Sequence, residues 1–354
     1  MGLKEQLEEI FAKYKDIFSG ACLIKKENQI FLHEAKGLAN RDFCIPNRTD
    51  TRFDTASVTK VFTAIAVLLL VEQKMLKLTD KIHNIIDLDN TSIPTDVLIE
   101  QLLNHTSGIA DDADEEAGED YSALFVDKPN YSIRNCADFL PQFAYKKPVF
   151  KAGTNVRYNN CAFVLLGLAI EKLTGMSYCD FVTVQIFEKA GMTNTYFGAM
   201  DEIRPNTAEG YFALKDAAGN FEKWKKNIYS YPPIGTADGG ALTTVWDLDV
   251  LMRALKSGAL LSPRSTESLF KPQCSFTRDK KIGTWRMGYA FEFIESDGEI
   301  FCMYKEGYNK GADAMFSYYP KLDITIDILA NQNGPLWKMH REMQAVLFDE
   351  VRRT

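Results

Sequence analysis

Residues 53–64 read FDTASVTKVFTA, and mostly apolar side chains continue as far as Leu76 with no glycine or proline among them. That length favours a buried helix beginning near Ser57. Residues three apart share one helical face, so the Lys60 amine is expected to reach the Ser57 hydroxyl. Unpaired N–H groups in the first turn would favour a developing oxyanion. Loss of solvent beside the apolar wall should lower the pKa of Lys60, so the pattern predicts a serine nucleophile with a basic partner.

A serine three residues before a lysine is a weak signal by itself, because average composition gives such a pair about once in a chain of this length. A second copy, Ser268 with Lys271, lies between two prolines and lacks a comparable helix start. For Ser57 the alternative is an ordinary serine at a helix N-terminus, with Lys60 simply solvated. The rest of the chain has to decide between these interpretations.

Further motifs follow this segment in a fixed order. They are Leu102–Gly108 (LLNHTSG), Tyr158-Asn159-Asn160, Leu165-Leu166-Gly167, Gly191–Thr195 (GMTNT), Gly239–Leu242 (GGAL) with Asp247, and Lys305-Glu306-Gly307. Together with residues 53–64, this order resembles the superfamily of class C β-lactamases, esterases, D-peptidases and penicillin-binding proteins. The resemblance covers residues 20–334, which is nearly the whole chain.

The resemblance implies roles for five polar residues. Ser57 would be the covalent nucleophile, with Lys60 and Tyr158 moving its proton. A phenol is a poor base at its usual pKa of about 10. The nearby Lys60 and Lys305 would favour the phenolate of Tyr158 or let it relay a proton to the leaving group. Asn160 would orient Lys60 and donate its amide to the substrate. Which of Lys60 and Tyr158 is the first base stays open, because coupled groups share their protons.

The strand expected around Lys305 would also supply binding groups. Gly307 would let the substrate lie close against the strand edge. The backbone N–H groups of Ser57 and Tyr308 would form the oxyanion hole, in which each donor is worth about 3 kcal/mol. Taken alone, Lys305 also fits a charge that protects a strand edge, and Asn160 also fits a turn or helix cap.

Glu306 departs from the family pattern, which has a small hydroxyl residue or glycine between the lysine and the glycine. In relatives that hydroxyl helps to hold a substrate carboxylate, which a glutamate would repel. We therefore expect β-lactams and D-Ala-D-Ala ends to be poor substrates, and a neutral or cationic ester or amide to be preferred. Residues 111–120 hold seven acids in ten positions. They would deepen the negative field if they rim the cleft, and otherwise they form a solvated loop.

These assignments predict a serine hydrolase that forms an acyl-enzyme on a small-molecule ester, amide or peptide, of esterase or D-amino-acid peptidase type. Two alternatives stay open: a penicillin-binding D-Ala-D-Ala carboxypeptidase or weak β-lactamase, and a non-catalytic binding or sensing member. A Ser-His-Asp triad is the rival chemistry, but the chain has no G-x-S-x-G and its four histidines form no pattern, with His105 typical of a turn. No metal or cofactor motif is present, so neither is expected.

The composition is that of a globular protein, with 46% hydrophobic and 25% charged residues among 354. A net charge of −7 gives no sign of nucleic-acid or anionic-membrane binding. The longest apolar run, residues 61–71, is shorter than the roughly 20 residues that span a bilayer. Seven scattered cysteines without a C-x-x-C favour free buried thiols in a reducing compartment. With no export signal visible, we expect a cytoplasmic protein unless a leader has been removed.

Strand patterns stand at both ends of the chain, with helical patterns between them. The expected strands are residues 21–25, 29–35, 287–294, 300–304, 314–319 and 324–329, and the expected helices are residues 1–20, 61–76, 162–173, 247–255 and 336–351. This order predicts an α/β (α+β) fold with one antiparallel sheet built from both chain termini and flanked by helices. Residues 1–80 and 235–354 would form the sheet domain and residues 81–234 a mainly helical insert, with the active site between them.

Overall fold

A sheet of eight strands forms the centre of the computed structural model, which describes residues 2–353. The strand order is β2-β1-β14-β13-β12-β11-β10-β9, and every neighbouring pair is antiparallel. The N-terminal hairpin of β1 (Gly20–Lys26) and β2 (Gln29–Lys36) pairs with β14 (Ile324–Ala330) near the other end of the chain. The predicted antiparallel sheet built from both termini is therefore confirmed.

The C-terminal half of the sheet contains two more strands than predicted. Its strands are β9 (Thr277–Lys280), β10 (Gly283–Met287), β11 (Glu292–Ser296), β12 (Glu299–Asn309) and β13 (Ala312–Tyr319). The prediction of a single strand over residues 287–294 is wrong, because the chain reverses between Met287 and Glu292. Ala290 takes a left-handed φ of 61° in that turn. A non-glycine residue gives little sign of such a bend in sequence.

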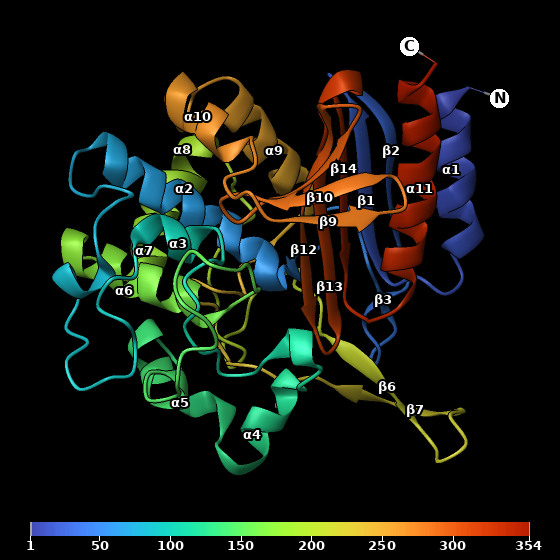
Figure 1. Ribbon diagram of the computed structural model, residues 1–354. Coiled ribbons are helices and arrows are strands. Elements are labelled where there is room, and N and C mark those ends of the chain that lie inside the picture. Colours follow the sequence, from blue (N-terminus) through green and yellow to red (C-terminus); the bar gives the residue numbers. More distant parts are fainter. Residues whose placement is uncertain (1, 354) are drawn as a thin grey trace.

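Both faces of the sheet are covered (Figure 1). On one face α1 (Leu3–Tyr14) and α11 (Pro335–Val351) lie side by side, and on the other lie α9 (Val245–Lys256) and the helices beyond it. Along β1, Ala21 and Leu23 enter the larger core while Cys22 and Ile24 enter the smaller core under α1 and α11. A one-residue slip would exchange the two sets, so this register is strongly specified.

The long helix after Ser57 is α2 (Thr59–Glu72), which is buried from Thr59 to Leu70 and packs against α6 (Cys161–Thr174). α6 ends at Gly175, which takes the left-handed conformation that glycine favours at a helix C-terminus. α2 ends four residues before the predicted Leu76. Lys74 takes a left-handed φ of 60°, and the Met75 N–H bonds to the Leu70 carbonyl. These two features form a Schellman motif in which Lys74 takes the place of the usual glycine. The end of the helix therefore could not be predicted from the sequence.

Shorter elements complete the fold. They are β3 (Leu38–Asn40), β4 (Ile45–Pro46), β5 (Phe53–Asp54), β8 (Leu242–Thr243), α3 (Ile99–Leu103), α4 (Leu124–Asp127), α5 (Leu140–Phe143), α7 (Tyr178–Val182), α8 (Glu188–Ala190) and α10 (Pro263–Leu269). A hairpin of β6 (Tyr211–Lys215) and β7 (Phe221–Lys226) projects from the body within the segment predicted to hold helices and loops (Figure 1). β7 is exposed along most of its length, so it lacks the alternation that predicts a strand. The division into two domains stays a prediction.

Within residues 2–353, no single helix has both the length and the apolar character needed to cross a membrane. One bent pair, Cys161–Thr174 with Tyr178–Ala190, meets those two criteria together. All seven cysteines are free. Cys22, Cys136, Cys161 and Cys302 are buried, as predicted, whereas Cys44 is exposed.

Candidate active site

Ser57 stands in a short 3-10 turn, Ala56–Val58, directly before α2. The strand before it, β5, is pinned by its pairing with β8. Ala56 has a φ of 43°, in the left-handed region that costs a residue with a side chain about 1–2 kcal/mol. Asp54 Oδ1 accepts the Ala56 N–H at 2.6 Å and so holds this turn. Burial raises the pKa of Asp54 to about 6. No role for Asp54 was predicted from the sequence.

The buried Lys60 side chain meets three acceptors. Its Nζ lies 3.1 Å from Ser57 Oγ, 2.8 Å from Asn160 Oδ1 and 2.5 Å from the carbonyl oxygen of Asp238. Burial lowers the pKa of Lys60 to about 8, the direction expected from its apolar surroundings. A neutral amine has two hydrogens and one lone pair. The two closer oxygens can keep the hydrogens while the lone pair faces the Ser57 hydroxyl, an arrangement suited to taking its proton.

Tyr158 contacts the same oxygen, since its hydroxyl donates to Ser57 Oγ at 2.7 Å. Lys305 Nζ lies 4.5 Å and Lys60 Nζ 5.1 Å from the centroid of its ring. The expectation that these lysines favour a phenolate is wrong. Burial first, and then the Glu115 carboxylate, raise the pKa of Tyr158 well above its usual value. The phenol therefore keeps its proton and serves as a donor.

Asn160 precedes α6 and joins Lys60 to the acidic segment. Its Oδ1 accepts from Lys60 Nζ, which is the predicted orienting contact. Its Nδ2, predicted to donate to the substrate, instead donates to Glu115 Oε1 at 2.8 Å. Glu115 lines the hollows on both sides of Ser57, so it belongs to the site. Nothing in the run of seven acids distinguishes Glu115 from its neighbours, which is why sequence analysis did not select it.

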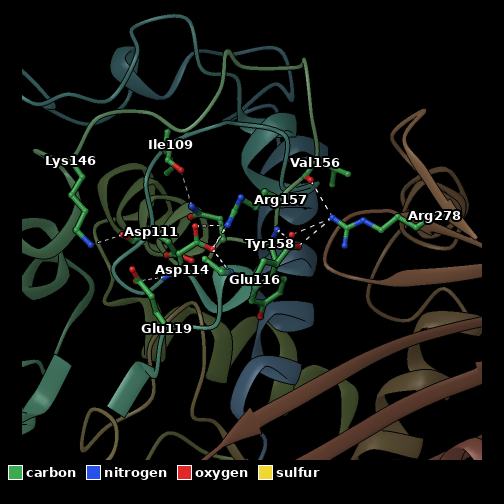
Figure 2. Close-up of polar contacts among 12 residues, drawn as sticks. Ile109, Asp111, Asp114, Glu116, Glu119, Lys146, Val156, Arg157, Tyr158 and Arg278 are labelled. Carbon is green, nitrogen blue, oxygen red and sulfur yellow. Dashed lines mark hydrogen bonds and ion pairs between the residues drawn. The ribbon is translucent and has the colours of Figure 1, made fainter. Parts of the chain in front are cut away.

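The acidic segment, residues 111–120, rims the site and is held there by polar contacts, although residues 115–120 are exposed to solvent (Figure 2). The backbone N–H of Tyr158 donates to Glu116 Oε1 at 3.1 Å. Three ion pairs hold the segment: Asp114–Arg157 at 2.6 Å, Glu116–Arg278 at 3.3 Å and Asp120–Lys310 at 2.8 Å. Arg278 lies in β9, and Lys310 directly follows β12; both strands belong to the large sheet. The segment therefore ties the region that carries Tyr158 to the sheet.

Lys305 lies buried on β12 beside the protein's own Glu292. Their side chains are 1% and 12% exposed, with Nζ 3.5 Å from Glu292 Oε1. Glu292 Oε2 also accepts from Trp285 Nε1 at 2.6 Å and from the Tyr304 hydroxyl at 3.2 Å. Breaking a buried ion pair by removing one partner costs about 3–5 kcal/mol. This carboxylate is therefore a fixed part of the site, and sequence analysis missed it because Glu292 lies in the wrongly predicted strand.

Gly307 brings β12 against the turn that carries Ser57. A Cβ at this position would lie 2.2 Å from the Thr55 carbonyl oxygen and 3.1 Å from Ser57 N. The glycine therefore allows β12 to approach the Ser57 turn closely. The sequence had instead predicted that Gly307 allows a substrate to approach the strand closely. The same contact sets the Ser57 amide beside Gly307 and Tyr308, as an oxyanion hole between these segments requires. The Tyr308 side chain is 53% exposed.

Two hollows open on either side of Ser57. The larger, about 290 Å³, is lined by Tyr158, Lys305 and Glu306 together with charged residues of the sheet and the acidic segment. The smaller holds about 30 Å³ and is lined by Asn160, Tyr231 and other residues around the nucleophile turn. Because Tyr158 stands at the larger hollow, a leaving group that takes its proton would lie there. The acyl group would then point into the narrower side.

Glu306 lies exposed on the wall of the larger hollow, as predicted from its place beside Lys305. Within residues 2–353 its carboxylate makes no hydrogen bond or ion pair, unlike Glu292 and Glu116 nearby. Partial loss of solvent between the walls, followed by repulsion from Glu292, raises the pKa of Glu306 to about 7. It is therefore an acid of the cleft that is open to a ligand.

The rival residues lie in ordinary structural positions. His105 takes a left-handed φ of 59°, and its Nδ1 accepts the Asn159 N–H at 3.1 Å, as expected of a turn histidine. Its ring stacks 4.7 Å from that of Tyr158, and burial lowers its pKa well below the usual value. Ser268 lies in α10, and Lys271 forms an exposed ion pair with Glu267. The second serine–lysine pair is therefore not part of this site.

Comparisons with known proteins identify the family of the chain. A family model described as "Beta-lactamase" matches residues 7–348. Penicillin-binding protein 4* of Bacillus subtilis (strain 168) is 30% identical over 273 residues, which are 73% of this chain and 56% of that protein. The chain spans about half the length of the curated relatives it matches.

Solved structures of similar fold include a penicillin binding protein and an amidase. A penicillin binding protein from Bacillus halodurans is 34% identical with a TM-score of 0.88, over 96% of this chain and 99% of that chain. The D-amino acid amidase from Ochrobactrum anthropi SV3, complexed with L-phenylalanine, is 19% identical with a TM-score of 0.74, over 99% and 98% of the two chains. The amidase shows likeness of fold alone.

Proposed function

Since the chain belongs to the beta-lactamase family, we propose that it is a serine hydrolase that forms its acyl-enzyme on Ser57. The observation that carries the proposal is the meeting of two proton-handling groups at one hydroxyl. Lys60 Nζ lies 3.1 Å and Tyr158 Oη 2.7 Å from Ser57 Oγ. A nucleophile within hydrogen-bond reach of a base that is itself oriented by a third group is the arrangement of an activated serine. Asn160 is that third group.

In acylation, Ser57 Oγ attacks the carbonyl carbon and its proton moves to neutral Lys60. The oxyanion accepts hydrogen bonds from the backbone N–H groups of Ser57 and Tyr308. Tyr158 gives its proton to the departing oxygen or nitrogen and recovers one from the Lys60 ammonium. In deacylation, water attacks the acyl ester and passes a proton to Lys60, and the Lys60 ammonium gives a proton back to Ser57 Oγ as it leaves. Lys60 and Tyr158 both contact Ser57 Oγ, and the atoms of both steps balance without a cofactor.

Turnover of a short chromogenic ester, with intact-protein mass measured during the reaction, is the test of this function. We expect hydrolysis and a transient mass increase equal to the acyl group. Penicillin, incubated in parallel, should be neither consumed nor attached. A penicillin adduct on Ser57 would instead favour the penicillin-binding carboxypeptidase or β-lactamase alternative. Binding of esters without any turnover would favour a non-catalytic member of the family.

The substrate class follows from the charges of the larger hollow. Lys305, the buried cation beside the nucleophile, is already neutralised by Glu292, so little positive charge remains there for a substrate carboxylate. Glu306 adds a carboxylate without an ion-pair partner within residues 2–353. Exposed Lys280 lines the same hollow and partly offsets this charge, and it lowers the pKa of Glu306 less than Lys305 does. We therefore propose an ester or amide whose leaving group is neutral or cationic.

Glu306→Lys should reverse this selectivity. With esters that differ only in leaving-group charge, we expect the ratio of kcat/KM for cationic over anionic substrate to fall at least tenfold, which is about 1.4 kcal/mol. In the wild type the ratio should rise with pH through about 7, because Glu306 gains negative charge there. The ratio cancels any pH effect of Lys60. Glu299→Gln, at the exposed far end of the same strand, is the matched control. An unchanged ratio in Glu306→Lys would exclude Glu306 from substrate selection.

A further inference from the structure

A second cluster of ligating side chains lies where the acidic segment meets the start of α6. One oxygen each of Asp111 and Asp112 and the Sγ atom of Cys161 lie within 4.8 Å of one another. Asp112 is 2% and Cys161 0% exposed, and Asp111 is half-buried. The proposed hydrolysis uses none of these three groups. The cluster therefore needs an explanation of its own.

Hydrogen bonding leaves one oxygen of this cluster unused. Asp111 caps α6, with Oδ2 accepting the Asn160 N–H and Oδ1 the Cys161 N–H, each at 2.9 Å. Asp112 Oδ1 accepts the Ala113 N–H at 2.8 Å. Asp112 Oδ2 is buried and has no hydrogen-bond partner within residues 2–353. A buried acceptor left unsatisfied costs about 1–3 kcal/mol, and more when charged. This oxygen points to a missing ligand.

Basic side chains near this pair of carboxyl groups make no ion pair with them in the described part of the chain. Lys146 approaches, but its Nζ donates to the backbone carbonyls of Asp111 and Asp112 at 2.9 and 2.8 Å (Figure 2). No Lys, Arg or His side chain in the described part of the chain forms an ion pair with either carboxylate. Two adjacent carboxylates and a cysteine sulfur thus share a small buried space without a cation.

We propose that Asp111, Asp112 and Cys161 bind one divalent metal ion of the zinc type. Zinc takes cysteine sulfur at about 2.3 Å and carboxylate oxygen at about 2.0–2.2 Å, so ligands of one ion lie about 3–4.5 Å apart. The cluster meets this spacing with small adjustments. A thiolate ligand disfavours calcium and magnesium, which prefer oxygen. On binding, the Cys161 S–H bond breaks, the proton passes to solvent and a sulfur–metal bond forms, with no change of oxidation state.

Such an ion would fasten the acidic segment to the first residue of α6. The neighbouring residue, Asn160, orients Lys60. The ion lies outside the path of the proton in hydrolysis, so its role is to hold the site together. It should raise the melting temperature without itself taking part in the chemistry of Ser57.

Cobalt substitution tests the site in the full-length protein. After treatment with a chelator, one equivalent of Co²⁺ should produce a near-ultraviolet absorption band from thiolate-to-cobalt charge transfer. Zn²⁺ should then displace the cobalt and raise the melting temperature above that of the metal-free protein. Ser57→Ala should bind the metal as the wild type does. Failure of this proposal is therefore distinguishable from failure of the proposed function.

Ligand variants locate the ion. Cys161→Ser should lose the band, and Asp112→Asn should weaken binding by more than the roughly 10- to 100-fold that loss of an outer-shell partner costs. Cys136→Ser, at another buried cysteine, and Cys44→Ser, at the exposed one, should keep both the band and the affinity. A folded wild type that shows neither the band nor a melting shift would overturn the proposal. Persistence of the band in Cys161→Ser would do the same.

Discussion

Ser57→Ala is expected to reduce ester hydrolysis by about 10⁶-fold, the order observed when the nucleophile of a serine protease is removed. Within residues 2–353, the Ser57 hydroxyl alone is hydrogen-bonded to both Lys60 Nζ and Tyr158 Oη, so no other hydroxyl there is placed to replace it. The measurement is hydrolysis of a chromogenic ester by purified variant and wild type. It is accompanied by intact-protein mass, in which the acyl adduct should disappear.

Ser268→Ala is the matched control for this experiment. Ser268 is the other serine that stands three residues before a lysine, but it lies in α10, and Lys271 pairs with Glu267 on the surface. Its removal should leave kcat/KM within the error of the wild-type value. If Ser57→Ala retained more than about one hundredth of wild-type activity, a water molecule or another side chain would be the nucleophile, and the acyl-enzyme mechanism would be wrong.

Features that depend on local periodicity or on motif order could be predicted from the sequence. Lys60 reaches Ser57 because residues three apart share a helical face, and the distance between them follows from helix geometry alone. A sheet built from both chain termini was expected because strand patterns occur only at the two ends of the chain, and the structure adds that β1 pairs with β14. Tyr158 and Asn160 could be assigned to the site only from the order of motifs, because no local rule predicts contacts with the Ser57–Lys60 segment across about one hundred residues.

Features that depend on tertiary contacts escaped prediction. Glu292 neutralises Lys305 only because β11 pairs with β12, and the turn that creates β11 contains a left-handed alanine instead of a typical turn residue. Glu115 becomes part of the site only because its carboxylate accepts a hydrogen bond from the side-chain amide of Asn160. The protonated state of Tyr158 also needed the structure. Sequence shows which lysines are near, but burial outweighs them and can be judged only once the surrounding atoms are placed.

Lys60→Met should lower kcat/KM by about 10³-fold, within the 10²- to 10⁴-fold range of general acid–base catalysis. Methionine fills a similar volume, but it can neither accept the Ser57 proton nor return one to Tyr158. Lys271→Met, at the exposed lysine of the second serine–lysine pair, should be silent. Denaturant unfolding of both variants should separate this loss from instability, because Lys60→Met also leaves Asn160 Oδ1 and the Asp238 carbonyl without their donor.

The pH dependence of the wild type gives the second half of this prediction. Lys60 acts as a base only after losing its proton, so kcat/KM should rise about tenfold per pH unit below about 8 and level off above it. The charged groups that face Lys60 are Asp238, Lys305, Glu115 and Asp111. Asn160→Asp would add a carboxylate beside Lys60 Nζ. This charge stabilises the Lys60 ammonium and should shift the rising part of the pH profile to higher pH. A profile that is flat from pH 6 to 9, or that does not move in Asn160→Asp, would exclude Lys60 as the base.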